Sequence, residues 1–523
     1  MPDTQHQDWR PRHNPWLIAL AVMLAPFMEV LDTSIANVAL PHIAGSLSAT
    51  NDQATWVLTS YLVSNAIILP MTGWLSNQFG RKRLLITCML IFTGASVLCG
   101  AAINLPTLIL ARILQGIGGG AMVPIAQSIL LESFPASKRG VAMAAFAQGV
   151  VVAPILGPTL GGWITDSYSW RWIFYINLPV GFLAIFMAQW LVEDPPYIRR
   201  NEKAAIDFVG FGLLAVWLAT LQITLDKGQE EDWFQSNLIC CLVVVSFISL
   251  VGFIFWEFRV RHPLVDLHVF KNRNFTVGLL LMTLIGAVLY GTTAELPLFM
   301  QTLMGYPALQ SGYAQSPRGV AAFLATAVIG RIVGKIRARW LLCFGFTLLA
   351  ASSFMLSDIS LQVSSMSIIW PSVLNGIAIS FIFVPLTTAT MSQIKQQQIG
   401  NAAGLYNLMR NLGGSIGIAF VTTIIVRGTQ SHQALMTGSL SALNPAFNEK
   451  IAALQAGFAK HTDPVTAAKQ AQAIVYQTLD QQAHLWAFVD NFKLFGWLAL
   501  GCIPLIFLFK RISGVKKPVV EVH

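Results

Sequence analysis

Fourteen long apolar runs divide this chain, and each is long enough to cross the hydrocarbon core of a bilayer as a helix. A backbone inside a membrane must satisfy its own hydrogen bonds, and a helix does so. The sequence therefore predicts an all-α polytopic membrane protein with 14 spans. The runs lie near 16–38, 54–75, 84–103, 105–131, 140–165, 172–192, 206–225, 237–258, 274–303, 311–331, 340–357, 366–392, 400–427 and 488–510.

Positive charges gather in every second connecting segment, beginning with the N-terminal one. If the N-terminus is cytoplasmic, the segments on its side hold 23 of the 33 Lys and Arg residues. Cytoplasmic loops of membrane proteins carry such an excess, so we expect both termini in the cytoplasm. The net charge of +9 then belongs to the loops, and we expect no nucleic-acid partner.

The runs are grouped as six, two and six. We expect an N-terminal six-helix bundle at 1–192, a linker with two inserted helices at 193–258, and a C-terminal six-helix bundle at 259–523. Such a layout is typical of transporters built from repeats. The outside segment 428–486 includes two stretches of helical composition, Asn448–Ala459 and Ala467–Leu485, so we expect a partly helical periplasmic element.

Two acidic residues, Glu29 and Asp32, lie inside the first apolar run. Three positions apart, they share one face of a helix. At about 1.5 Å per residue, Asp32 lies about 9 Å inside the outer end of the span, and Glu29 lies deeper. An ionised group at that depth is costly unless it is paired or faces water, which predicts a functional role. The alternative is that both acids simply reach the interface.

Span four places a cation at a matching depth. Arg112 lies about 10 Å below the outer end of a helix that enters from outside. This match favours an ion pair or a shared water cavity with Asp32 over an arginine that reaches the headgroups. A nearby cation favours the charged form of a carboxyl group, and burial favours the protonated form. We therefore predict a functional role for Asp32 together with Arg112 and Glu29.

Two glycine-containing stretches predict close backbone approaches. Gly73–Arg83 joins spans two and three, and its glycines Gly73 and Gly80 allow a tight turn before the cations Arg81, Lys82 and Arg83. Span five holds Pro154, Gly157, Pro158, Gly161 and Gly162. Small residues let another helix approach within backbone contact. This span is either a tight helix crossing or a hinge between the two halves.

Taken together, these stretches resemble the major facilitator superfamily, and within it the fourteen-span drug:proton antiporters of the EmrB/QacA type. The resemblance is carried by Leu31–Pro41, Gly73–Arg83, Arg112–Gly116, Gly157–Gly162, Trp170–Gly181 and Asn407–Gly417. It implies two six-helix bundles with two extra helices between them. It also implies drug export from the bacterial inner membrane, driven by the proton gradient with no cofactor. Gly157–Gly162 is similar to the antiporter motif, which accompanies export. Arg112–Gly116 is similar to the proton-coupling motif, so the resemblance implies that Asp32, with Arg112 and Glu29, couples proton movement to transport.

Two positions depart from the family pattern. Asn77 stands where the loop motif usually has an aspartate, which puts a charge-relay role of that loop in doubt. Ala153 stands where the antiporter motif usually has a glycine, so that turn is expected to be slightly stiffer.

Charged residues also lie inside the second half. Glu295 and Arg318 are about 12 and 10 Å below the outer surface, so they either mirror Asp32 and Arg112 or form a structural pair. Arg410 lies near the middle of span thirteen and either lines the cavity or pairs with a helix carbonyl. Phe27 and Tyr61 are candidates for an apolar substrate pocket, although packing is the commoner role of such residues. The same two roles are open for Trp56, Tyr290 and Phe383.

The sequence thus predicts a proton-coupled exporter of amphipathic compounds that works by alternating access. A proton symporter that imports a nutrient is the alternative, and Gly157–Gly162 disfavours it. A membrane-embedded enzyme or sensor is a further alternative, but the nine histidines are scattered and form no catalytic or metal-binding pattern. The resembled family also suggests a periplasmic adaptor and an outer-membrane channel as partners of 428–486, which is otherwise a passive cap. No motif names the substrate.

Overall fold

The computed structural model describes residues 11–135, 138–195, 207–260, 263–362, 364–438, 440 and 444–510. All regular structure in these ranges is helical. The first part contains α1 (Pro15–Ser46), α2 (Asn51–Phe79), α3 (Arg81–Gly100), α4 (Leu105–Gly119), α5 (Met122–Ser133), α6 (Arg139–Ser167), α7 (Trp172–Tyr175) and α8 (Asn177–Leu191). The middle pair is α9 (Phe208–Lys227) and α10 (Asn237–Glu257). The last part contains α11 (Arg273–Thr302), α12 (Ala308–Ile332), α13 (Ala338–Ser357), α14 (Ser365–Met391), α15 (Ile399–Thr437), α16 (Pro445–Phe458) and α17 (Pro464–Ile506).

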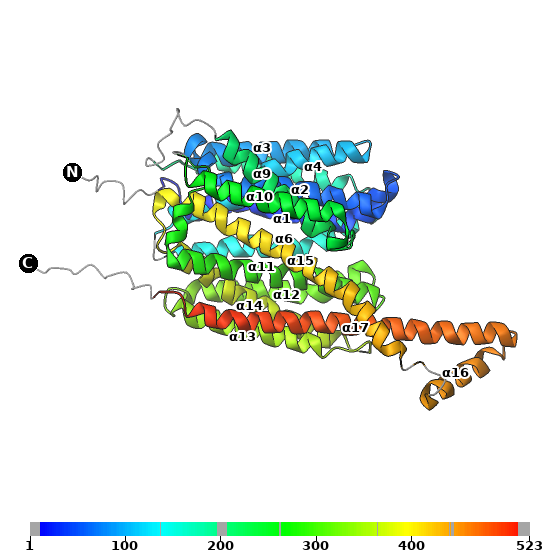
Figure 1. Cartoon of the computed structure of the whole chain (residues 1–523). Coiled ribbons are helices and arrows are strands. Elements are labelled where there is room, and N and C mark those ends of the chain that lie inside the picture. Colours follow the sequence, from blue (N-terminus) through cyan, green and yellow to red (C-terminus); the bar gives the residue numbers. More distant parts are fainter. Residues whose placement is uncertain are drawn as a thin grey trace, which may run out of the picture.

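The predicted all-α membrane fold is confirmed. Within the described ranges, thirteen helical segments are long and apolar enough to cross a membrane. The remaining predicted span, 311–331, forms α12, which is more polar because it contains Gln315, Ser316 and Arg318. It nevertheless packs against α14 and against α6, as a spanning helix would (Figure 1).

Local sequence signals explain where several helices begin. The Asn14 side chain caps α1, whose first residue is Pro15. Capping boxes begin α2 at Thr50 and α4 at Asn104. Each cap satisfies backbone N–H groups that the first helical turn leaves without a partner.

The fourth predicted span is interrupted, and glycines account for the break. Gly118, Gly119 and Gly120 lie where α4 ends, before α5 begins. A Cβ on Gly118 would lie 2.6 Å from the Phe92 nitrogen, and one on Gly120 would lie 2.6 Å from the Asn65 oxygen. The glycines therefore let this span lie directly against the backbones of α2 and α3, at the level of the buried polar residues.

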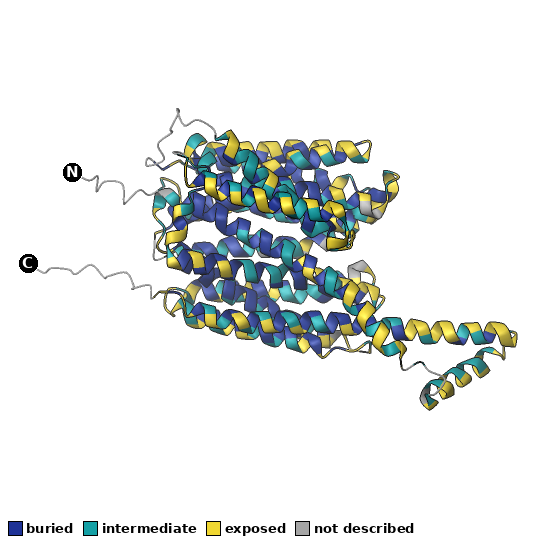
Figure 2. Ribbon diagram, viewed as in Figure 1, coloured by how far each residue is buried: buried dark blue, intermediate teal, exposed yellow. Residues whose placement is uncertain are grey.

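The helices form two neighbouring groups (Figure 1). Helices α1–α8 pack mainly against one another, and α11–α17 do the same. The helix α9 of the middle pair contacts α2 and α15, one helix from each group, and α10 packs against α9. Buried residues face the inside of the bundle, and exposed residues cover its outside (Figure 2). Many of the exposed residues are aromatic or aliphatic, such as Phe186, Trp190 and Phe247, which suits a lipid-facing surface.

The segment 428–486 is built largely from continuations of two spanning helices. α15 continues to Thr437, and α17 begins at Pro464 and runs unbroken for 43 residues. At about 1.5 Å per residue, α17 is about twice as long as the ~30 Å hydrocarbon core is thick. Both helices project beyond the bundle with α16 (Figures 1 and 2). The expected helical stretches are present, and the helices that contain spans thirteen and fourteen continue well beyond the predicted apolar runs.

Candidate functional site

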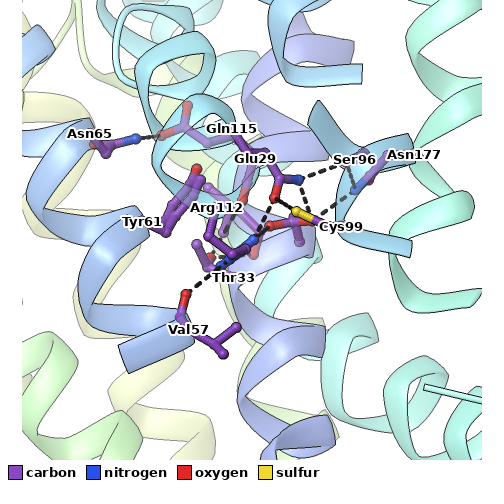
Figure 3. A network of polar contacts seen from close by, with 12 residues as sticks. Glu29, Thr33, Val57, Tyr61, Asn65, Ser96, Cys99, Arg112, Gln115 and Asn177 are labelled. Carbon is purple, nitrogen blue, oxygen red and sulfur yellow. Dashed lines mark hydrogen bonds and ion pairs between the residues drawn. The ribbon is translucent and has the colours of Figure 1, made fainter. Parts of the chain in front are cut away.

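The Asp32 carboxylate accepts hydrogen bonds from three side chains on two other helices. Arg112 of α4 donates from Nη1 to Oδ2 at 2.5 Å. Gln115, one helical turn further along α4, donates to Oδ1 at 2.8 Å, as does Asn177 of α8 at 2.8 Å. The Ser96 hydroxyl of α3 accepts from both amides, at 2.7 Å and 3.1 Å. All five side chains are buried, and they form this network by bonding to one another (Figure 3).

Arg112 is fixed by further contacts. Its Nε donates to the Val57 carbonyl of α2 at 3.0 Å. Its guanidinium carbon lies 4.4 Å from the centre of the Tyr61 ring and 5.6 Å from that of Phe174. A cation over an aromatic face is stabilised by the ring quadrupole. Residues of α1, α2, α4 and α7 thus fix the position of the guanidinium. Tyr61, a candidate for the substrate pocket, packs on it.

Glu29 lies one turn before Asp32 on α1 and has different neighbours. The Asn65 amide of α2 donates to its Oε1 at 2.8 Å (Figure 3). The charge of Arg410, on α15 of the other helix group, acts on this carboxyl group. Arg410 is buried, and its guanidinium donates to Oδ1 of its neighbour Asn411 at 3.3 Å. Glu29 therefore faces the junction between the two groups, whereas Asp32 is enclosed within the first. Phe27, on the same helix, is only half-buried.

Helix α6 lies against α1 at the glycine-rich stretch. A Cβ on Gly157 would overlap the Ser34 side chain, and one on Gly161 would lie 3.2 Å from Ile35 Cγ2. Proline has no N–H, so Pro158 leaves the carbonyl four residues earlier without its helical partner. Ser34 Oγ donates to that carbonyl, of Pro154, at 3.4 Å.

Other residues of this stretch differ in their surroundings. Gly162 has nothing within 4 Å of an added Cβ, so it does not contribute to the close approach. The side chain of Pro158 lies outside the described residues. Ala153 is fully buried.

The turn between α2 and α3 is held by two acidic residues that the motif does not contain. Gly80 has a φ of +82°, a conformation that suits glycine. Asp194, after α8, accepts from the Lys82 backbone N–H at 2.9 Å, while Lys82 Nζ donates to the Gln189 carbonyl at 2.6 Å. Arg81 forms a buried ion pair with Glu132 at the end of α5. Arg83 and Asn77 are exposed.

The two helix groups contact each other near this turn. We call this end of the bundle the Gly80 end. A Cβ on Gly73 of α2 would lie 2.6 Å from the Asn401 Cα of α15. Nearby on the same helices, one on Gly404 would lie 2.5 Å from the Leu69 oxygen. Deeper in the bundle, Asn407 Nδ2 donates to Gln127 Oε1 at 2.8 Å. These contacts close the junction at the Gly80 end.

Residues 22–418 match the family model of the Major Facilitator Superfamily. The chain belongs to this superfamily. The fatty acid resistance protein FarB of Neisseria gonorrhoeae is 38% identical over 94% of this chain and 96% of FarB. The multidrug export protein EmrB of Escherichia coli K12 is 39% identical over 82% of this chain and 84% of EmrB.

Solved structures of this superfamily's fold agree at the level of architecture. The crystal structure of the human organic anion transporter MFSD10 aligns with a TM-score of 0.58 at 14% identity, covering 93% of this chain and all of MFSD10. A double-tryptophan mutant of XylE aligns with a TM-score of 0.56 at 15% identity, covering 95% of this chain and 99% of that protein.

The second helix group of this superfamily member does not repeat the Asp32–Arg112 pair. Among the described residues, Glu295 and Arg318 form no ion pair. Glu295 is fully buried in α11 beside Asn491 of α17, and neither carboxyl oxygen has a hydrogen-bond partner in the described structure. Arg318 lies on α12. The interpretation of these two residues as a structural pair is therefore wrong, because equal depth does not bring two helix faces together.

Sequence reasoning missed four polar residues of the site. Gln115 and Asn177 lie inside stretches that carried the family resemblance, but no role was assigned to them. Ser96 is one small polar residue in an apolar helix and carries no recognisable signal. Glu132 lies near the end of its span, beside basic residues, so it resembles an ordinary interfacial acid.

Proposed function

We propose that this chain is a proton-coupled exporter of amphipathic compounds that works by alternating access across the bacterial inner membrane. EmrB is named as a multidrug export protein and FarB as a fatty acid resistance protein, which supports export of such compounds. The observation that carries the proton coupling is the Asp32–Arg112 ion pair, which is enclosed inside a membrane-spanning helix group. Ionisable groups at that depth are costly and mark ion pathways.

Proton binding at Asp32 is the proposed coupling step. An ionised carboxylate only accepts hydrogen bonds, and the three donors that face Asp32 match that form. Protonation removes the charge that Arg112 faces and turns one carboxyl oxygen into a donor. The network then has one donor too many, so α1, α4 and α8 must adjust to one another. The proton gradient is the only energy source that this step needs.

Helix packing supports alternating access. Contacts between Gly73 and Asn401, and between Asn407 and Gln127, hold the two helix groups together towards the Gly80 end. If that end is cytoplasmic, as the Lys and Arg distribution predicts, this is an outward-facing conformation. Because α1 carries Asp32 and lies against Gly157 of α6, an adjustment at the carboxylate is transmitted to a helix that contacts α12 and α14 of the other group.

The proposed substrate region lies between the groups, near Glu29 and Arg410. These two buried residues come from α1 and α15, on opposite sides of the junction between the groups. A substrate that carries a charge on an apolar body could exchange with one member of this pair as the groups move. Asn65 holds Glu29 in place from α2. A midplane site of this kind, apolar with a few polar groups, is typical of small-molecule binding sites.

The projecting element of α15, α16 and α17 is the proposed docking region for a periplasmic adaptor that leads to an outer-membrane channel. Its helices are held side by side by a hydrogen bond of 2.5 Å from Gln433 to Asp480 and a contact of 2.8 Å between His432 and Asp490. A helical stalk of this length exceeds what a tight connection between two spans needs.

Transport direction is the decisive test of this function. Everted vesicles that contain the protein are acidified inside and challenged with a panel of cationic, anionic and neutral amphiphiles, while internal pH and accumulated compound are followed. We expect accumulation inside the vesicles together with proton release. Compound movement in the same direction as protons would instead establish a symporter, and the absence of both would reject transport of these compounds.

A further inference from the structure

A cavity lies apart from the Asp32 site, where the helix pair α9–α10 meets both helix groups. Its volume is about 390 Å³. Its wall includes Pro70 of α2, Trp217 of α9, Leu250 and Phe253 of α10, Phe270 before α11, and Leu405 of α15. We call it the α9–α10 cavity.

The chemistry of the wall restricts the occupant. Every lining residue is aliphatic or aromatic, and the exposed surface of the cavity is almost entirely apolar. Cavities of this kind do not hold water, because water needs polar partners. The space is also much too small for a helix, whose diameter is about 10–12 Å with its side chains. An alkyl chain matches both the chemistry and the size.

The cavity is reached from the bilayer. Ile254 and Phe258, two of its lining residues, are 41% and 59% exposed on α10. The helices α9 and α10 bury only 28% and 22% of their most apolar windows, the smallest shares among the spanning segments. A hydrocarbon chain of the surrounding membrane can therefore enter from the side without crossing water.

Cations lie beside the cavity at the Gly80 end. Phe270 of the wall is followed by Lys271 and Arg273, and Phe258 is followed by Arg259. All three cations are exposed, and the Arg259 guanidinium lies 4.0 Å from the centre of the Phe255 ring.

The acids of the same region are engaged within the protein. Glu257 is buried and accepts from the Val265 backbone, and Asp266 accepts from His268 and Gln398. Asp207 likewise accepts from Trp256 and Gly210, so the exposed charges described at this edge of the cavity are the three cations. Basic pockets between spanning helices are suited to anionic lipid headgroups.

We propose that the α9–α10 cavity binds an acyl chain of an anionic phospholipid from the leaflet at the Gly80 end, with the headgroup phosphate beside Arg259, Lys271 and Arg273. Because Pro70 and Leu405 belong to different helix groups, the bound chain contacts both of them. Anionic lipid then stabilises the conformation in which α2 and α15 are packed together. The role of the α9–α10 pair is to complete this site.

The test uses the full-length protein in nanodiscs that contain phosphatidylglycerol with a photoactivatable acyl chain. Crosslinked peptides are identified by mass spectrometry. We expect labelling concentrated on residues 250–258 and 405–409. Labelling spread evenly over all lipid-facing helices would overturn the proposal, and this result does not depend on any variant.

Two tryptophan substitutions on α10 provide the matched comparison. Leu250→Trp fills the cavity and should reduce labelling at residues 405–409 to the background of exposed lipid-facing helices. Val244→Trp adds the same side chain at a residue that is 55% exposed and does not line the cavity, and it should leave labelling unchanged. Equal labelling in both variants would contradict the proposal.

The headgroup is tested separately. Labelling by phosphatidylglycerol should exceed labelling by phosphatidylcholine with the same chains, and the difference should vanish in Arg259→Gln/Lys271→Gln/Arg273→Gln. Equal labelling by both lipids in the unmodified protein would reject the anionic headgroup. Displacement of the probe by an equimolar free fatty acid would show a site for single-chain amphiphiles instead of phospholipid.

Discussion

Asn407 of α15 donates a 2.8 Å hydrogen bond to Gln127 of α5, and both side chains are buried where the two helix groups meet. This bond joins side chains that are 280 positions apart in the chain. The proposed alternating access requires the groups to separate at the Gly80 end, and this bond would then break.

Asn407→Ala should shift the protein towards the conformation that is open at the Gly80 end. Loss of one partner from a buried hydrogen bond costs about 1–3 kcal/mol, and here only the closed form bears that cost. Distances between spin labels at the exposed positions Asn77 and Lys395 should become longer. Ser128→Ala removes a bond within α5 only and should leave the distances unchanged. Identical distance distributions in the two variants would contradict this role.

Gly157→Leu should abolish transport while the protein still inserts into the membrane. A side chain at this position overlaps Ser34 and forces α6 away from α1. Efflux and membrane abundance are measured together. Gly162→Leu is the matched control, because nothing lies within 4 Å of its Cβ position, and it should retain transport. Normal efflux by Gly157→Leu would remove this helix contact from the mechanism.

Counting residues along each helix predicted how deep the buried charges lie, but not which helix face each side chain occupies. Asp32 and Arg112 were expected at about 9 and 10 Å below the outer surface, and they form an ion pair. Glu295 and Arg318 were matched in the same way and form none. The rise per residue fixes how deep a residue lies, whereas the face that it occupies depends on helix packing, which one sequence does not specify.

Glu132→Ala should lower the thermal stability of the protein more than any change at the exposed cation of the same turn. Removing one partner of a buried ion pair costs about 3–5 kcal/mol, because the other charge keeps its desolvation cost. Arg81 and Glu132 are such a pair. Unfolding of the detergent-solubilised protein is followed by tryptophan fluorescence, with Arg83→Ala as the control. Equal midpoints for the two variants would show that the pair adds no stability.

Replacing residues 438–476 by a short Gly/Ser connector should preserve antiport in vesicles and abolish resistance in whole cells. The shortened helices can be joined because Gln433 already lies against Asp480. Proton release from vesicles and growth in the presence of a transported compound are the two measurements. If the shortened protein protects cells fully, the projecting element neither docks an adaptor nor caps the vestibule. Loss of antiport in vesicles would favour the cap.

The helical class and the spanning helices could be predicted from the sequence because the apolar runs are long. A backbone inside a membrane must also satisfy its own hydrogen bonds, which a helix does. The projection of α15 and α17 could not be predicted, because their outer halves contain the alanine and glutamine of any soluble helix. The break at Gly118–Gly120 had a visible signal in three consecutive glycines, which was not used. Gln115 and Asn177 could not be placed, because a neutral polar side chain in a span has many ordinary roles.

Substrate-induced proton release by Asp32→Asn tests the central claim most directly. Everted vesicles with the unmodified protein, Asp32→Asn or the exposed-site control Asp166→Asn are acidified, and the rise in internal pH on addition of a transported compound is recorded. The account predicts a rise for the unmodified protein and for Asp166→Asn, and none for Asp32→Asn at equal abundance. A normal rise with Asp32→Asn would make Asp32 a structural acid and contradict the account.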